Sequence, residues 1–169
     1  QLPSRLVIPG QAGIGKTTFA AYSPSPLFLL SPGETGLHTL IDGGLLPEVP
    51  NIEVPNWDAV LPLLEELTLT EHPHKTLVLD TGDGFEKLAN HHVCMTDYAG
   101  DFGEKGFMGY QRGHRTVAMG PWKMLLAALD KLREAKRMGI IMLCHTGIAN
   151  FANPAGADYN RFSPTMHKE

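Results

Sequence analysis

The sequence predicts an α/β fold of three layers, in which helices cover both faces of a mostly parallel sheet. Short apolar runs alternate with longer segments that have a helical period. A glycine-rich stretch stands directly between the first apolar run and the first helical segment. Strands that alternate with helices form right-handed βαβ units, whose strands lie parallel in one sheet.

The first strand is expected at residues 6–8, and the residues that follow it, 10–17, match the phosphate-loop pattern G-x-x-x-x-G-K-[ST]. Glycines in such a loop let backbone N–H groups turn toward a phosphate. The lysine reaches the β- and γ-phosphates, and the threonine hydroxyl binds Mg²⁺. A helix opens after the loop. We therefore expect these residues to bind ATP: Gly10, Gln11, Ala12, Gly13, Ile14, Gly15, Lys16, Thr17 and Thr18.

The second strand is expected at residues 27–30, between a proline-rich breaker and a loop that carries Glu34. Three glycines, the first of them Gly36, indicate irregular chain up to residue 44. A short strand at residues 52–54 follows. Asn56 is then a candidate N-cap for a helix whose apolar face starts at Trp57, although Pro62 interrupts the helical pattern.

A buried strand is expected at residues 76–80 and a helix at residues 85–95. Residues 98–120 are rich in glycine and charge and have no sustained apolar period, which predicts one or more long mobile loops. Pro121 suits a first helical turn, and the leucines after it predict an amphipathic helix that ends near Gly139. The last strand is expected at residues 140–144.

Polar side chains stand at the ends of several of these strands. The phosphate loop follows the first strand, Glu34 the second, and Asp80 and His145 end two later ones. Ligands of parallel sheets bind at the carboxyl ends of the strands, so these segments are expected to form one site. Asp80 would hold Mg²⁺ opposite Thr17. The alternative is that Asp80 only forms a turn or caps a helix.

Hydrolysis of ATP needs a base or a water-orienting group near the γ-phosphate. Thr81 and not a carboxylate follows Asp80, and Glu34 follows the second strand, so Glu34 is one candidate for this role. The alternative for Glu34 is a solvated loop carboxylate. His145 is equally open to two readings, a polar group near the γ-phosphate or a satisfied packing residue.

Two segments mix basic and aromatic residues, as sequence-tolerant binding sites for single-stranded nucleic acid do. Solvated loops with a few anchoring aromatics are the alternative. The candidate contacts are Lys105, Arg112 and Arg115 in the first segment, and Phe151, Tyr159, Arg161, Phe162 and Lys168 in the second.

Composition limits the classes of protein to be considered. The chain has 169 residues, 43% of them hydrophobic and 19% charged, which predicts a single domain over residues 1–169. A net charge of −4 excludes nucleic-acid binding by net charge alone and requires a local basic patch. Two cysteines, no signal peptide and no membrane-length apolar run favour a cytosolic protein. Because the first residue is not methionine, we expect both ends to be trimmed.

The chain resembles phage and prophage RecA-like nucleotide-binding proteins, an ATP-binding family with an AAA domain that includes the Sak-type single-strand annealing ATPases. The late segment resembles the family pattern x-x-F-x-[DN]-P-x-G-x-D-Y-x-R-[FY]. The resemblance rests on residues 10–20, on residues 26–29 leading to 34–37, on residues 75–81, on residues 144–146, and on residues 151–162.

The resemblance implies a RecA-like core, with further sheet strands expected beyond residue 169. It implies ATP and Mg²⁺ as cofactors and single-stranded DNA as partner, in phage recombination, annealing or replication within the bacterial cytosol. It also implies a homo-oligomeric ring or filament, with a single-strand-binding protein as a further candidate partner. By position, Glu34 matches the family's catalytic glutamate and His145 its γ-phosphate sensor; with Lys16 they form the expected catalytic group.

Two other functions stay open at this point. One is a P-loop phosphotransferase that acts on a small molecule, although only Arg112 and Arg115 form a close arginine pair of the kind a lid would carry. The other is a nucleotide-responsive binding module with little turnover. The chain has no N-K-x-D motif, which counts against a GTPase switch.

Overall fold

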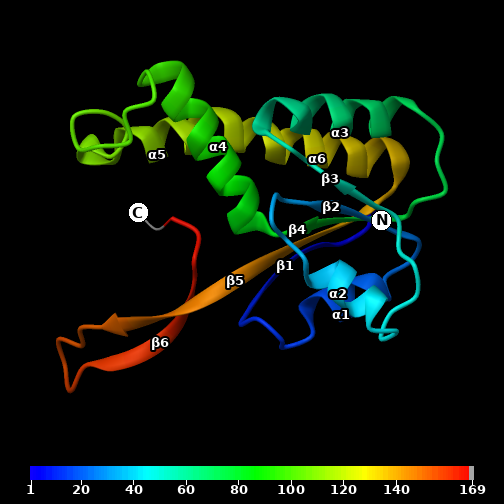
Figure 1. The fold of residues 1–169 in the computed structure, drawn as a ribbon, viewed down its shortest axis with the longest axis horizontal. Coiled ribbons are helices and arrows are strands. Elements are labelled where there is room, and N and C mark those ends of the chain that lie inside the picture. The colour runs from blue at the N-terminus through cyan, green and yellow to red at the C-terminus, as the bar shows by residue number, and fades with distance from the viewer. Residues whose placement is uncertain (168–169) are drawn as a thin grey trace.

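The computed structural model describes residues 1–167 and has the predicted α/β architecture (Figure 1). The strands are β1 (Arg5–Gly10), β2 (Pro26–Leu30), β3 (Asn51–Glu53), β4 (Thr76–Asp80), β5 (Gly139–Phe151) and β6 (Tyr159–Pro164). The helices are α1 (Lys16–Ala21), α2 (Gly36–Asp42), α3 (Val60–Leu69), α4 (Gly82–Asp97), α5 (Arg112–Val117) and α6 (Lys123–Lys136).

The sheet has six strands and is mostly parallel, which confirms the predicted fold class. Five strands run in the order β1-β5-β4-β2-β3, and all their pairings are parallel. β6 pairs only with β5, in antiparallel direction. Since β5 lies between β1 and β4, the register places His145 beside Gly10 and Leu143 beside Asp80.

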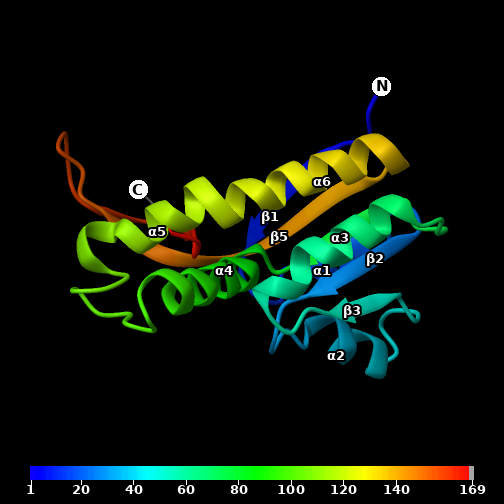
Figure 2. The same cartoon turned by 90° about the horizontal axis from the view of Figure 1, so that it is seen from above.

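Helices cover both faces of the sheet, with α3, α4 and α6 on one face and α1 and α2 on the other (Figures 1 and 2). Two hydrophobic cores form, one on each face of the sheet. Successive residues of each central strand therefore pack into these two cores alternately. In β2, Leu29 packs toward α3, α4 and α6, whereas Phe28 and Leu30 pack toward α1 and α2. Burial on both faces explains why the central strands are apolar throughout. No helix of the described chain is long and apolar enough to span a bilayer.

The start of α3 follows the sequence prediction. The Asn56 side chain accepts a hydrogen bond from Ala59 N at 3.1 Å and caps a 3-10 turn at Trp57–Ala59, from which α3 continues. Pro62 is the third residue of α3, where its missing N–H removes no helical bond. The regular α-helix begins at Val60, later than Trp57, which agrees with an interruption of the helical pattern near Pro62.

The prediction of irregular chain over residues 36–44 is wrong, since α2 occupies Gly36–Asp42. Leu37, Leu40 and Ile41 have helical spacing and pack on the sheet, and this burial outweighs the glycines at either end. Gly43 is the C-cap of α2, so the glycines mark the boundaries of the helix.

Only the first half of the predicted loop at residues 98–120 is irregular. Residues 112–136 form α5, a π-helical turn at Ala118–Trp122, and α6 in unbroken succession. Pro121 lies inside the π turn and not at a helix start. The π turn shifts the helical period, which hides the continuity of α5 and α6 from a search for one apolar stripe.

The last core strand is longer than predicted. β5 continues past His145 to Phe151 and forms a hairpin with β6, from Thr146 paired with Pro164 to Phe151 paired with Tyr159. His145 therefore lies inside a strand, and the expected loop of residues 151–162 is largely a hairpin arm that projects from the body (Figure 1). Beyond Cys144 the strand is half-exposed and more polar, so the apolar run ends before the strand does.

Candidate nucleotide-binding site

The phosphate loop joins β1 to α1 and curves around an open space. Gly13 and Gly15 have φ angles of 79° and 93°, a left-handed backbone that glycine adopts without strain. The Lys16 amine donates hydrogen bonds to Gly10 O and Gln11 O, both at 2.8 Å. These contacts hold the amine against the loop.

Thr17 and Asp80 bring two hard oxygen ligands together from α1 and the end of β4. Thr17 Oγ1 donates to Asp80 Oδ2 at 3.2 Å, and Asp80 is 2% exposed. Burial, followed by the charge of Glu34, raises the pKa of Asp80 to about 6. A buried carboxylate that faces a second carboxylate and a hydroxyl fits a Mg²⁺ ion shared with phosphate oxygens.

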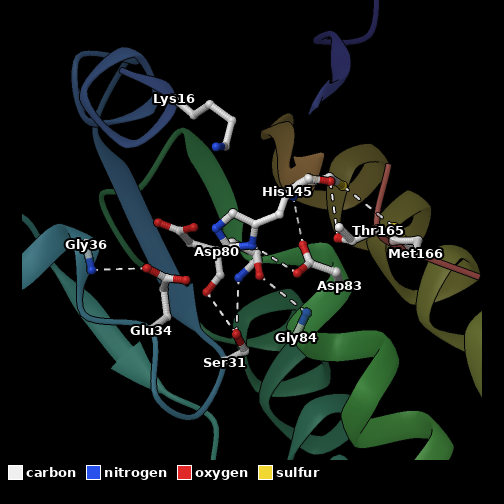
Figure 3. Close-up of polar contacts among 12 residues, drawn as sticks. Lys16, Ser31, Glu34, Gly36, Asp80, Asp83, Gly84, His145, Thr165 and Met166 are labelled. Atoms are coloured by element: carbon white, nitrogen blue, oxygen red, sulfur yellow. Dashed lines mark hydrogen bonds and ion pairs between the residues drawn. The ribbon is translucent and has the colours of Figure 1, made fainter. Parts of the chain in front are cut away.

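Glu34 follows β2 on a loop that is tied to the end of β4. Ser31 N donates to Asp80 O at 2.8 Å, and the Ser31 hydroxyl accepts from Thr81 N at 3.2 Å. The Glu34 carboxylate accepts from Gly36 N at 3.1 Å. The loop and the first turn of α2 therefore fix Glu34 toward the phosphate loop (Figure 3).

His145 is oriented by Asp83, in the first turn of α4. Asp83 Oδ1 accepts from the His145 backbone N–H at 2.9 Å, and Oδ2 lies 3.0 Å from Nδ1. Burial raises the pKa of Asp83, but these contacts with His145 outweigh it, so the pKa lies below the ordinary value. Because Asp83 engages Nδ1, the opposite ring nitrogen is left for a ligand.

These side chains surround one cavity of about 310 Å³, beside the loop (Figure 3). The predicted residues that line it are Ala12, Gly13, Gly15, Lys16, Thr17, Thr18, Glu34, Asp80 and His145. Gly10 and Gln11 contact the Lys16 amine, and Ile14 is exposed. The catalytic and binding roles of these residues stay predictions, but their positions in one cavity are those that the roles require.

The predicted nucleic-acid contacts lie at one end of the molecule, on the α5 side and on the hairpin arm (Figures 1 and 2). Arg161 lies over the Phe151 ring, 4.6 Å from its centroid, and the Phe151 and Tyr159 rings are 5.2 Å apart. Phe162 is on the opposite face of the arm, paired with Ile148.

On the α5 side, Lys105 and Arg115 are exposed. The Arg112 guanidinium donates to Gly109 O and Lys105 O, so it braces the loop. Lys168 lies outside the described residues.

Sequence reasoning missed two parts of the site. Asp83 is not among the predicted site residues, although a carboxylate three residues after Asp80 was an available signal that it lies near the site. The second missed part is the chain just after β6, which lies against His145. Thr165 donates to His145 O from its amide at 3.0 Å and from its hydroxyl at 3.2 Å, and no short motif marks these bonds.

Comparisons with known proteins agree with this geometry. A protein-family model described as an AAA domain matches residues 2–169. None of the curated proteins matches the chain significantly. The family match covers nearly all of a chain whose phosphate loop, mostly parallel sheet and clustered polar residues are those of a nucleotide site. The chain therefore belongs to the AAA domain family of P-loop nucleoside triphosphatases.

Proposed function

We propose that this protein is a Mg²⁺-dependent, RecA-like ATPase that acts on single-stranded DNA, in phage recombination, annealing or replication. One observation carries the proposal. His145 lines the nucleotide cavity and lies in β5, which ends at the half-buried Phe151. β5 pairs with β6, the strand that carries the exposed Tyr159, Arg161 and Phe162. β5 and β6 together thus connect a triphosphate site with a surface suited to stacked bases.

Each residue of the cavity has a distinct task in this reaction. The loop amides and Lys16 bind the phosphates, while Thr17 and Asp80 would hold Mg²⁺. Mg²⁺ held by these two residues would neutralise charge on the phosphate oxygens. Glu34 accepts a proton from the attacking water. His145 contacts the γ-phosphate through Nε2, in the orientation that Asp83 imposes on its ring.

The contacts around His145 connect the nucleotide cavity with the hairpin arm. Its side chain faces the cavity, and its backbone carbonyl accepts the two hydrogen bonds from Thr165, just beyond β6. A shift of His145 on ATP binding therefore changes both strands of the hairpin. Phe151 and Tyr159 stack with bases, and Arg161 pairs with a phosphate. Subunits assemble as a homo-oligomeric ring or filament on the strand.

The test is release of phosphate from Mg²⁺-ATP by the purified protein, with and without a single-stranded oligonucleotide. We expect DNA to stimulate turnover, and we expect Lys16→Ala to abolish turnover with and without DNA. Arg161→Ala should lower DNA affinity and the stimulation. Lys131→Ala, which removes an exposed cation from α6, is the matched control. Turnover that is insensitive to DNA would contradict the proposal.

A P-loop phosphotransferase is the second candidate, favoured by one specific observation. A neighbouring cavity of about 290 Å³ shares Glu34 and His145 with the nucleotide cavity and is also lined by Lys87. A small acceptor could bind there, next to the γ-phosphate position. Stimulation of ATP consumption by small hydroxyl compounds without phosphate release would support this function. ATP-dependent oligomer size with negligible turnover would instead indicate a binding module.

A further inference from the structure

A second cavity, of about 650 Å³, lies between α4, α5, the π turn and the chain that follows β6. It shares no lining residue with the nucleotide cavity. Its wall includes Asn90, Tyr110, Gln111, His114, Arg115 and Trp122. Neither the proposed ATP chemistry nor the hairpin arm uses this cavity.

The backbone around the cavity departs from regular structure at two places. Tyr110 and Gln111 are consecutive non-glycine residues with φ angles of 48° and 56°. The π turn Ala118–Trp122, which joins α5 to α6, also lines the cavity and contributes Trp122. Left-handed residues and π turns both have an energetic cost and concentrate at functional sites. Here they leave the Tyr110 side chain fully exposed at the mouth of the cavity.

Two polar atoms in the wall lack partners. Asn90 Oδ1 and His114 Nδ1 are shielded from water, and neither has a hydrogen-bond partner among residues 1–167. A buried polar atom without a partner costs about 1–3 kcal/mol. Both residues line the cavity, and their terminal torsions are broad, so either side chain can reorient there. A ligand with a hydrogen-bond donor would then satisfy Asn90.

The remaining groups narrow the chemistry of the ligand. Tyr110 and the half-buried Trp122 offer aromatic faces to a flat ring, and the exposed Arg115 offers a charged fork to a phosphate. The Glu86 carboxylate, which accepts from His167 N at 3.0 Å through both oxygens, places a negative group on the α4 side. A ligand therefore needs a flat ring with an amine toward α4 and a phosphate toward Arg115.

We propose that this cavity binds one unstacked base of single-stranded DNA, with Tyr110 and Trp122 on its faces, its exocyclic amine at Asn90, and its phosphate at Arg115. The inference rests on the proposed action on single-stranded DNA and adds a site to it. The helix α5, which lines the cavity, and the hairpin arm lie at the same end of the molecule (Figures 1 and 2). One strand could therefore run from the arm to the cavity.

The test combines fluorescence anisotropy of labelled oligonucleotides with tryptophan fluorescence of the full chain. Trp57 is buried in the core, so quenching by bound DNA should come from Trp122 and disappear in Trp122→Phe. Tyr110→Ala should weaken binding about 5- to 150-fold, the range for loss of one base stack. Tyr22→Ala, at another exposed tyrosine, should bind like the wild type. Oligo-dC and oligo-dA, which carry an exocyclic amine, should bind more tightly than oligo-dT.

Arg115→Ala supplies a second, independent measurement, since its side chain is exposed and its loss should lower the salt slope of binding by about one. DNA binding with no tryptophan quenching and no effect of Tyr110→Ala would overturn the base site and leave the proposed function standing. If the wild-type protein binds no single-stranded DNA, both proposals fail.

Discussion

The surroundings of the Asp80 carboxylate in the folded protein disfavour its ionised form. It is buried at the end of β4 and faces Glu34, and its pKa is raised to about 6. A cation beside Thr17 would remove this conflict, because it favours the ionised form of Asp80. Below pH 6 the proton competes with the cation, and binding of Mg²⁺-ATP is expected to weaken.

Asp80→Asn should stabilise the protein at neutral pH when nucleotide and Mg²⁺ are absent. The raised pKa means that the folded state keeps its proton to higher pH than the unfolded chain does. The unfolding free energy of the wild type therefore falls as the pH rises from about 4 to about 6, by about 1–3 kcal/mol, and asparagine avoids this loss. Urea denaturation at pH 4, 5, 6 and 7 measures the difference. A gap between the two proteins that does not change with pH would contradict the prediction.

Glu34→Gln should separate nucleotide binding from hydrolysis. Glutamine keeps the size of the side chain and an oxygen for the Gly36 amide, but it cannot accept a proton from water. We expect kcat for ATP hydrolysis to fall by about 10²- to 10⁴-fold, with nearly unchanged binding of an ATP analogue. Phosphate release and calorimetric titration test the two parts. Wild-type turnover would transfer the role of base to another residue.

At the scale of elements, β5 shows why the position of His145 at the cavity was predictable while the full length of its strand was not. His145 was found because an apolar run stops at Cys144, and burial on both sheet faces requires such a run. The same signal fails beyond His145, where β5 pairs with one strand and alternates weakly. Asp83 was missed as the partner of His145 because contacts between residues 62 positions apart leave no local pattern.

Contact between α5 and the loop before it gives a prediction at this scale. A Cβ atom on Gly113 would overlap the Phe107 ring, which is buried beneath α5. Gly113→Ala should therefore lower the unfolding free energy by about 1–3 kcal/mol, as overpacking does. Gly120, in the π turn, has no atom within 4 Å of a built Cβ. Gly120→Ala is the matched control and should leave stability unchanged or raise it by about 0.5 kcal/mol.

The overall architecture is predictable from the sequence wherever the spacing of apolar residues is regular. The strands β1, β2, β4 and β5 and the two helical layers were predictable, because a parallel sheet with helices on both faces is the way to bury strands such as residues 76–80 completely. The helix α2 and the joined α5 and α6 were not. Their stability comes from packing on the sheet and from a π turn, and neither appears in the spacing of apolar residues.

Nucleotide should stabilise the whole molecule, since the phosphate loop, Glu34, Asp80 and His145 come from separate parts of the chain. Binding to the folded state alone adds about 2.7 kcal/mol at a ligand concentration of 100 Kd. We expect a higher Tm with Mg²⁺-ATP for the wild type and no rise for Lys16→Ala. Scanning calorimetry at several ATP concentrations measures it. An equal rise in both proteins would place the binding elsewhere.

The length of β5 past the sheet has a mechanical consequence. From His145 to Phe151 the strand extends about 20 Å, at about 3.3 Å per residue. β6 stiffens this extension along most of its length. A pivot of about 10° at His145 would therefore carry the tip about 3.5 Å, which is roughly the thickness of one stacked base. A small displacement of His145 at the phosphates would therefore become a larger displacement at the tip of the arm, where single-stranded DNA is proposed to bind.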